Sequence, residues 1–568
     1  MLFNSIEYLF FLPIIFLIYW TIGYARINDS LKLRMQNIFL LLASYVFYAW
    51  WDYRFLLLLV GMSLIAYISG YAIVNSEKLR VNSKACLIAN IIIDLGVLAV
   101  FKYYNFFVGS FADLFGLQNT IHSLKIVLPL GISFFTFQAI SYVVDVYKRK
   151  IEPTNIVDCL LYIGFFPKLL AGPIERPTNL IPQIQKSRVF EYDLAVDGCR
   201  QMLWGLFKKV VIADNCALYV NQVYGDYANQ SGSTLLLAAI LYTIQIYGDF
   251  SGYSDMAIGS AKLLGFRFRD NFLFPYFSRN MNEFWRRWHI SLNTWFVDYV
   301  YIPLGGSRPD LKTKTQINTV PDINIDKLSN QKIIEKNTEL SDTYSIPNSI
   351  DHQFAREQAP GQPNAQSYLI DSVAQTLSDN SSQKIPKNSK NERLRKVITC
   401  RNIMIVFLLS GLWHGADWSF VAWGAYHGLL LVLLILLNRN TKYEHVVAYD
   451  KVLPSFKELG QMLLVFALAT FGWMMFRADN MTQFIDYTRH MCSADLLSVP
   501  FLINRDFYMP LTLWLAIMFI TEWLMRNKRH GLDIASLPPY VRYIIYLVVI
   551  FIVGIFGGHT TNYIYFQF

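Results

Sequence analysis

The chain has 568 residues, of which 54% are hydrophobic and only 16% are charged. Soluble globular proteins carry roughly a quarter of charged residues, so this composition argues against a water-soluble domain and against a disordered or fibrous protein. Long apolar runs recur along almost the whole chain, which predicts a polytopic α-helical membrane protein. The net charge of +9 does not indicate nucleic-acid binding, because many Lys and Arg residues lie in loops between apolar runs, where they orient a membrane protein.

Thirteen apolar segments are candidates for membrane or re-entrant helices. Several of them are too short or too polar to cross a bilayer at about 1.5 Å per residue. We therefore predict an all-α protein with about eleven or twelve transmembrane helices, accompanied by re-entrant or interfacial helices. The segments lie near Ile6–Gly23, Gln36–Trp51, Phe55–Val74, Ala85–Phe107, Ile126–Tyr147, Ile156–Ala171, Leu203–Val220, Leu235–Leu264, Ile403–Trp413, Phe420–Leu437, Leu459–Phe476, Leu511–Leu524 and Ile544–Phe556.

A polar stretch interrupts this pattern between Ser307 and Lys396. It is rich in Asn, Asp, Gln, Ser and Lys and contains no Trp. Such a composition cannot bury much apolar surface, so we predict a mostly disordered cytoplasmic insertion; a small regulatory or partner-binding module is the alternative. The membrane core then comprises residues 1–306 and 397–558, and residues 559–568 form a short aromatic tail.

Basic residues indicate which loops face the cytoplasm. The loops after the first, third and fifth apolar segments each carry three Lys or Arg residues, whereas the loops between them carry fewer. The positive-inside rule places the basic loops in the cytoplasm, so we expect the N-terminus and the C-terminal tail outside.

Several motifs of familiar chemistry are absent. The sequence contains no GxxxxGK[ST] phosphate loop, no HExxH zinc helix and no GxSxG nucleophile elbow. Its six cysteines form no CxxC pair, so we expect neither a metal site nor a disulfide framework. We expect no bound cofactor either.

Two of the nine histidines lie in contexts that suggest chemistry. His414 lies within or at the edge of an apolar segment, and His289 lies in the sequence FWRRWHISL. A neutral imidazole can take a proton from a hydroxyl group and return it later, and an ionisable residue inside a membrane is a functional candidate. A hydrogen bond between helices is the alternative for both residues.

A polar run between Tyr247 and Ala257 also interrupts an apolar segment. Within a membrane such groups must face protein or a water-filled cavity. They either line the path of a polar substrate or form a buried network that joins helices, and the second reading is slightly favoured. The candidate side chains are Asp249, Ser251, Ser254 and Asp255.

Residues 284–295 combine three tryptophans with Arg286 and Arg287. This pattern is typical of a helix at the membrane interface, with its rings among the lipid headgroups. Alternatively, the two arginines bind an anionic donor such as CoA or the phosphopantetheine of a carrier protein. The tryptophans are Trp285, Trp288 and Trp295.

Seven segments together resemble the membrane-bound O-acyltransferase superfamily. The resemblance is to its bacterial branch in particular, typified by alginate O-acetylation membrane proteins and teichoic-acid D-alanyl transfer membrane proteins. The segments follow the family's order and cover most of the chain. They are residues 128–138 (LPLGISFFTFQ), 171–177 (AGPIERP), 249–256, 284–292, 298–306, 410–416 and 565–568.

The resemblance implies an enzyme of the bacterial inner membrane whose helices surround a central tunnel. It implies that His414 is the reactive histidine, that His289 is the second one, and that the acyl donor is a cytoplasmic thioester, either acyl-CoA (acetyl-CoA above all) or an acyl carrier protein. The acceptor is then a hydroxyl of an exported or cell-surface polysaccharide, and an extracytoplasmic esterase-like acyltransferase completes the transfer. The family usually lacks the insertion at 307–396. The resemblance therefore does not indicate how the donor binds on the face where the insertion lies.

The aromatic end YIYFQF reads, on its own, as part of a membrane-interface belt. In teichoic-acid systems, however, a small partner peptide with a very similar end is proposed to carry the acyl group on its tyrosine. The resemblance therefore implies that Tyr565 is an acyl carrier, with His414 as its general base. A phenol, with a pKa of about 10, leaves more readily than an alkyl alcohol, which suits an ester intermediate.

Other functions fit part of the sequence. Within the family, a lipid or a protein is the alternative acceptor. A transporter or flippase would use Asp249 and Asp255 and would need no thioester donor, and a scaffold would only hold the outer enzyme. Replacement of His414 distinguishes these functions, because only the acyltransferase needs it to form a covalent product.

Overall fold

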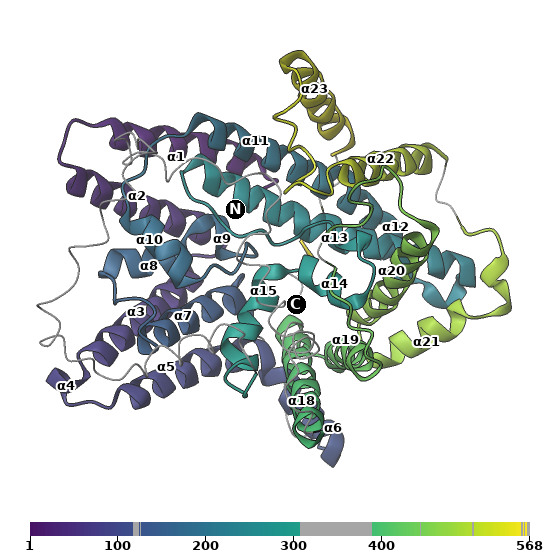
Figure 1. The fold of residues 1–568 in the computed structure, drawn as a ribbon, viewed down its shortest axis with the longest axis horizontal. Coiled ribbons are helices and arrows are strands. Elements are labelled where there is room, and N and C mark those ends of the chain that lie inside the picture. Colours follow the sequence, from purple (N-terminus) through teal and green to yellow (C-terminus); the bar gives the residue numbers. More distant parts are fainter. Residues whose placement is uncertain are drawn as a thin grey trace, which may run out of the picture.

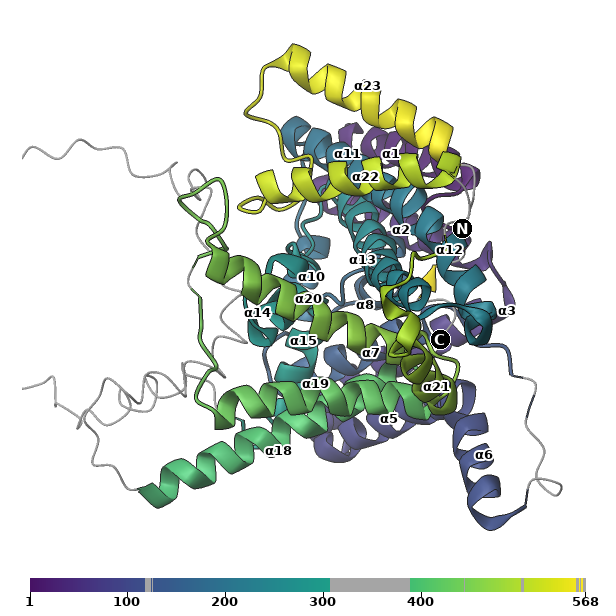
Figure 2. The same ribbon diagram turned by 90° about the vertical axis from the view of Figure 1, so that its right-hand side faces the viewer.

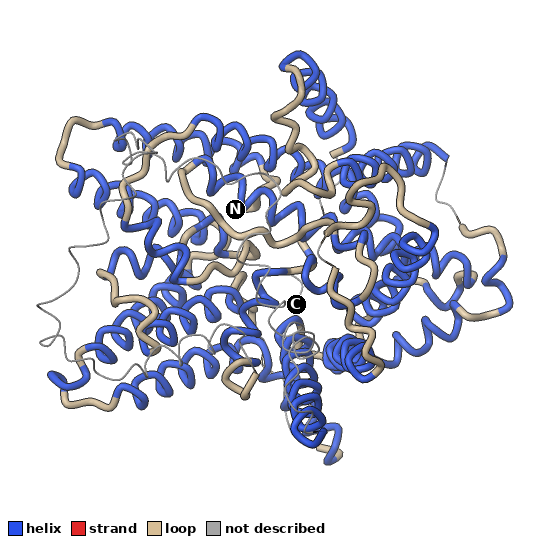
Figure 3. Tube along the Cα trace, in the orientation of Figure 1, coloured by secondary structure: helices blue, strands red, loops and turns tan. Residues whose placement is uncertain are grey.

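The computed structural model describes residues 1–117, 124, 126–306, 389–443, 445–501, 505–557, 561, 563 and 564. All regular secondary structure in these residues is helical (Figure 3), which confirms the predicted all-α class. The polar insertion lies outside the described residues, except that residues 389–396 begin α18.

Short connections link most of the helices. The segments η1, η2 and η5 are π-helical, and η3, η4 and η8 are 3₁₀ helices. The bounds are α1 (Ile6–Tyr24), α2 (Asp29–Ala49), α3 (Arg54–Val74), α4 (Ser76–Leu79), α5 (Ser83–Leu98), η1 (Ala99–Tyr103), α6 (Tyr104–Phe115), α7 (Ile132–Tyr147), α8 (Ile156–Gly164), α9 (Phe166–Leu169), α10 (Pro177–Gln185), α11 (Tyr192–Leu206), η2 (Phe207–Ala213), α12 (Asp214–Gly225), η3 (Tyr227–Asn229), α13 (Gly232–Leu263), η4 (Pro275–Phe277), α14 (Met281–Arg287), α15 (Ile290–Phe296), η5 (Val297–Tyr301), α18 (Ser389–His414), α19 (Trp418–Leu436), α20 (Phe456–Arg477), α21 (Met481–Met491), η8 (Ala494–Leu497), α22 (Arg505–Leu524) and α23 (Pro539–Phe556).

Within the described ranges, eight helical stretches are long and apolar enough to cross a membrane, as a multi-pass membrane protein requires. Two shorter apolar helices accompany them, α7 and residues 509–524 of α22. Eight is fewer than the eleven or twelve spans expected from sequence. One reason is that apolar segments such as Ile156–Ala171 break into short buried helices, α8 and α9. The eight lie in α1, α3, α5 through α6, α13, α18, α19, α20 and α23.

Helix α13 is the central element of the bundle. Its apolar window is 83% buried, whereas that of α23 is only 11% buried. It packs against α11, α12 and α20. In Figure 1, α1–α5, α7, α8 and α10 lie on the left and α12 and α20–α22 on the right, with α13, α14 and α15 between them. The outer helices therefore offer their exposed apolar side chains to lipid, and the polar groups of α13 face protein.

The ends of the helices define two opposite sides. In Figure 2, α18 and α20 begin on the left and α19 ends there, so the connection between α19 and α20 lies on the left. The connection between α22 and α23 lies on the same side, and the N-terminus lies on the right. The insertion therefore joins α18 on the side opposite to the N-terminus.

The tryptophans of residues 284–295 correct one prediction. Trp285, Trp288 and Trp295 are at most 5% exposed, because α14 and α15 are enclosed by longer helices. Trp295, for example, stacks on Phe137 with ring centroids 3.7 Å apart. The predicted location at the membrane interface is therefore wrong. Tryptophan rings are common both at membrane interfaces and in buried aromatic clusters, so a sequence rich in tryptophan does not distinguish the two locations.

Candidate functional site

The two candidate histidines meet in the interior of the molecule. His289 precedes α15 and His414 ends α18, and their ring centroids are 6.3 Å apart although 125 positions separate them in the sequence. Both are buried, with exposed fractions of 1% and 6%. Two imidazoles at this distance, shielded from water, form a site at which a proton can be taken up and returned.

Asn271 holds His289 in one tautomer. His289 Nδ1 lies 3.0 Å from the side-chain oxygen of Asn271, which also accepts from the Ser291 hydroxyl at 2.9 Å. The Asn271 amide nitrogen donates to Ser254 at 3.0 Å, which assigns the oxygen to the His289 side. Because this oxygen only accepts, Nδ1 carries the proton and Nε2 is the basic nitrogen.

The backbone at His289 is locally strained. Its φ is +45°, in the left-handed region, and it stands at the N-terminus of α15 without a side-chain cap. The N–H of the next residue, Ile290, donates to the backbone carbonyl of Asn271 at 3.0 Å. The same asparagine therefore fixes both the helix start and the histidine ring, which is consistent with a functional role for the strain.

Lys102 holds the end of α18 that presents His414. Its ammonium donates to the carbonyls of Trp413 (2.6 Å) and His414 (3.0 Å), and it comes from the π-helical segment η1. The last carbonyls of a helix lack partners within the helix and carry the negative end of its dipole, so a half-buried cation there is favourable. A cavity of about 20 Å³ between Lys102, Ser133 and His414 has room for about one water molecule.

Aromatic rings enclose the imidazole of His414. The ring centroids of Trp413, Trp423 and Phe476 lie 4.9, 5.1 and 5.3 Å from that of His414. Phe476 also packs edge-on against Phe420. This wall excludes bulk water, which strengthens electrostatic interactions inside the site and protects a reactive ester from hydrolysis.

A larger cavity lies beyond Phe420. Its volume is about 300 Å³, and its polar lining includes Gln245 and Arg477. Thr561 and Ile564 of the C-terminal tail also line it. Phe420 lines this cavity and packs against Phe476, which in turn packs against His414.

The polar run on α13 divides between two tasks. Asp255 pairs with Lys208 at 2.7 Å, and Lys208 also donates to Ser251 at 2.8 Å, so these groups join α13 to η2. Asp249 pairs with Lys209 at 2.7 Å in the same way. Ser254 instead supports the Asn271 amide that orients His289.

The tail lies against this network. The N–H of Ile564 donates to Asp249 at 2.8 Å. Tyr565, the predicted acyl carrier, is the next residue in the sequence and lies outside the described residues, so its role stays a prediction.

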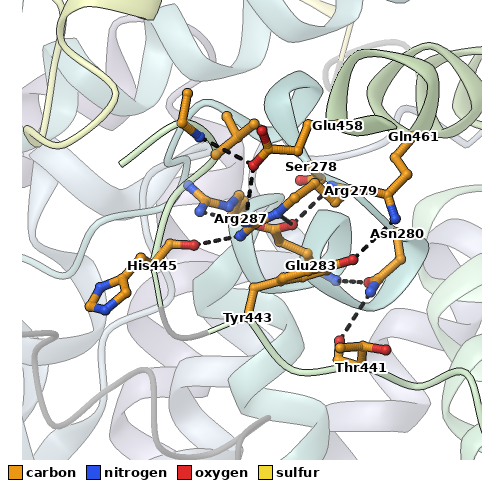
Figure 4. Close-up of polar contacts among 12 residues, drawn as sticks. Ser278, Arg279, Asn280, Glu283, Arg287, Thr441, Tyr443, His445, Glu458 and Gln461 are labelled. Carbon is orange, nitrogen blue, oxygen red and sulfur yellow. Dashed lines mark hydrogen bonds and ion pairs between the residues drawn. The ribbon is translucent and has the colours of Figure 1, made fainter. Parts of the chain in front are cut away.

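Arg287 belongs to a polar cluster on α14 (Figure 4). Glu283 accepts from Arg279 and Arg287, each at 3.0 Å. Burial alone would raise the pKa of Glu283, but Arg287 and Arg279 outweigh burial and hold it below its ordinary value. Arg279 lies 3.7 Å from the ring centroid of Tyr443 and donates to the carbonyl of His445, so the cluster ties α14 to the connection between α19 and α20. These contacts engage Arg287 within the protein. Arg286 is partly exposed.

Four residues of this site were not predicted from the sequence. Lys102, Lys208 and Lys209 all lie inside predicted apolar segments, so their charge within a membrane was a signal that could have identified them. Asn271 follows the end of α13 in an irregular stretch, where neither periodicity nor charge marks it.

The chain is similar to known proteins of one family. The model of the family described as "MBOAT, membrane-bound O-acyltransferase family" matches residues 123–319. A probable alginate O-acetylase of Pseudomonas aeruginosa is 34% identical over 486 residues, which cover 85% of this chain and 73% of that protein. A peptidoglycan O-acetyltransferase of Helicobacter pylori is 26% identical over 88% of this chain and 81% of its own length. A teichoic acid D-alanyltransferase of Bacillus subtilis is 32% identical over 30% of this chain and 45% of its own length. These matches confirm the predicted resemblance.

Proposed function

The chain belongs to the membrane-bound O-acyltransferase family, and from this premise we propose that it transfers an acetyl group across the bacterial inner membrane for O-acetylation of an exported or cell-surface polysaccharide. The observation that carries the proposal is the meeting of His289 and His414, whose ring centroids lie 6.3 Å apart in a buried aromatic setting. The names of the alginate and peptidoglycan relatives support acetyl as the group and a polysaccharide as the acceptor.

In the proposed reaction His414 is the general base and Tyr565 is the nucleophile. His414 takes the phenolic proton as the Tyr565 oxygen attacks the thioester carbonyl of the donor. The carbon–sulfur bond breaks, the departing thiolate receives the proton from His414, and Tyr565 is left as an acetyl ester. His289, with its Nε2 unprotonated, assists through the same buried site.

The proposed orientation places the donor on the side where α18 begins. The connections between α19 and α20 and between α22 and α23 lie on that side (Figure 2). The first holds Arg439, Lys442 and Lys451, and the second holds Arg526, Lys528 and Arg529. The positive-inside rule makes this side cytoplasmic and puts the N-terminus and the tail outside. An acetyl group then crosses through a tunnel lined by the two histidines, whereas neither CoA nor a polysaccharide has to cross.

The proposed donor is acetyl-CoA or an acylated carrier protein, used as a substrate rather than as a bound cofactor. Arg286, which is partly exposed, is a candidate for binding its phosphates. Outside, we propose that an esterase-like acyltransferase takes the acetyl group from Tyr565 and delivers it to the glycan. A lipid or protein acceptor would use the same donor half-reaction.

The test uses purified full-length protein in detergent with isotope-labelled acetyl-CoA and mass spectrometry of the C-terminal peptide. Wild type and His490→Ala, which changes an exposed histidine on α21, should carry label on Tyr565. His414→Ala should lose the label by a factor of about 100 or more, as removal of a general base does. Full labelling of His414→Ala would refute the proposed role of His414, and a transporter or scaffold would give no labelled peptide in any variant.

A further inference from the structure

A fully buried cluster of three charges lies at the junction of η2, α12 and α13. Lys209 of η2 is flanked by Asp214, the first residue of α12, and by Asp249 in the middle of α13. The Lys209 ammonium lies 2.8 Å from Asp214 and 2.7 Å from Asp249. The side chains of the three residues are 0%, 0% and 3% exposed. One cation therefore faces two carboxylates without bulk water, which is costly unless further hydrogen bonds complete the cluster.

The C-terminal tail supplies those hydrogen bonds. A lysine ammonium has three hydrogens. Two of them point to the carboxylates of Asp214 and Asp249, and the third donates to the carbonyl of Thr561 at 3.0 Å. The Thr561 hydroxyl donates to Asp214 at 2.5 Å. The second oxygen of Asp249 accepts from the Ile564 N–H. Three polar groups of the tail thus bond to the three residues of the cluster, one to each.

Tyr563 closes the cluster from the same segment. Its ring centroid lies 4.2 Å from the Lys209 ammonium, and its ring packs edge-on against Tyr253 at 5.0 Å. Tyr563 is 1% exposed and Ile564 is 3% exposed. A cation over an aromatic face gains more where water is excluded, so the tail also adds to the binding of Lys209.

We propose that Lys209, Asp214 and Asp249 form a dock for Thr561, Tyr563 and Ile564 and thereby position the reactive end of the tail. We call these three residues the tail dock. Its ligand is a peptide segment that offers one carbonyl, one hydroxyl and one backbone N–H. The three residues are positioning residues. Their effect on Tyr565 rests on the proposed function, because only that proposal makes Tyr565 a nucleophile.

Charge makes this dock more selective than an apolar groove. If the tail leaves, an ammonium hydrogen and carboxylate oxygens lose partners in a buried place, and unpaired buried charges are strongly unfavourable. If the tail shifts by one residue, the carbonyl and the N–H no longer face the cation and the anion that they match. The dock therefore specifies both that the tail binds and in which register it binds.

The first experiment measures the tail directly in the full-length protein. The purified protein is digested with a carboxypeptidase, and the shortened products are followed by intact-mass spectrometry. In wild type, trimming should stop before Ile564, because this residue is buried and its N–H is held. Lys209→Met and Asp249→Asn should speed the removal of Ile564 by about tenfold or more, as loss of a charge-assisted hydrogen bond allows.

Matched variants separate docking from a general loss of stability. Lys208→Met removes the neighbouring buried lysine, which pairs with Asp255 and has no hydrogen bond or ion pair to the described residues of the tail, and it should leave trimming unchanged. Thr561→Val changes the tail itself and removes only the hydroxyl that donates a hydrogen bond to Asp214. It should speed trimming, and this result does not depend on whether the variants in the core fold well. Trimming at the wild-type rate in Thr561→Val and in folded Lys209→Met would overturn the dock.

The second experiment separates the dock from the proposed function. In the labelling reaction with acetyl-CoA, dock variants should lower the maximal rate constant of labelling about tenfold or more and leave the acetyl-CoA concentration for half-maximal rate unchanged, because the dock acts on the tail and not on the donor. A raised half-maximal concentration with an unchanged maximal rate constant would overturn the positioning role. A wild-type tail that resists trimming but never becomes labelled would refute the proposed function and leave the dock standing.

Discussion

At the scale of single residues, one asparagine connects the polar run of α13 to the chemistry of the site. Asn271 accepts from His289 and Ser291 and donates to Ser254, so it links the His289 imidazole and the start of α15 to α13. A histidine acts as a base only with the correct nitrogen unprotonated, and the group that holds the other nitrogen decides which one that is. Asn271 therefore acts on the reaction through His289.

We expect Asn271→Leu to reduce acetyl labelling of the tail about 100-fold, because His289 then loses both its tautomer and its orientation. Ser254→Ala removes only the acceptor for the Asn271 amide and should cost a smaller factor, about threefold to tenfold. Initial rates of labelling with isotope-labelled acetyl-CoA measure both. Equal losses in the two variants would mean that the hydrogen bond from Asn271 to Ser254 of α13, and not the one to His289, accounts for the effect.

At the scale of elements, the two packed helices α18 and α19 position the site residues His414, at the end of α18, and Trp423, on α19. The two helices approach so closely that a Cβ at Gly424 would lie 2.3 Å from the carbonyl oxygen of Phe407. A Cβ at Gly411 would lie 2.2 Å from the carbonyl oxygen of Phe420. Both obstacles are backbone atoms, which cannot rotate away. Small residues at a membrane helix contact permit this approach, and the position of His414 depends on it.

Gly424→Ala should therefore destabilise the protein by about 1–3 kcal/mol through overpacking, and it should also lower the labelling rate because Trp423 moves with α19. The matched control is Gly460→Ala on α20, where a Cβ would meet nothing within 4 Å. The control should keep or slightly raise the melting temperature, since alanine favours the helix over glycine. Thermal unfolding in detergent compares the two, and equal melting temperatures would contradict the close-packing argument.

The sequence predicted where the helices of this fold lie along the chain more reliably than it predicted what each helix contacts. Apolar runs marked most of the helices, since the bilayer and the protein core both require them. The same runs do not show whether a side chain faces lipid or protein. For this reason the tryptophans of α14 and α15 fit the pattern of an interface helix although their rings lie inside the protein. Lys209 was visible as a charge inside an apolar segment, but its partners Asp249 and Thr561 lie 40 and 352 positions away. Only the fold brings such groups together.

At the scale of the whole molecule, the chain on both sides of the insertion is held without it. The carbonyl of Leu304 accepts from Arg401 at 3.1 Å and from Asn402 at 3.3 Å, which ties the end of the first half to α18. Arg401 lies about 18 Å along the helix from Ser389, at about 1.5 Å per residue. About ten extended residues span about 33 Å, so a linker of that length can replace residues 307–388.

We expect replacement of residues 307–388 by a Gly/Ser linker of about ten residues to leave the melting temperature and the labelling rate with acetyl-CoA within about twofold of wild type. The reason is that polar insertions change loop-closure entropy only slightly with length, and this one has little apolar surface to bury. A second variant keeps the length and composition of residues 307–388 but scrambles their order. Unchanged melting with a raised KM in both variants would assign donor recognition to the specific sequence of the insertion. A raised KM in the linker variant alone would assign it to charge or length, because the scrambled segment keeps both.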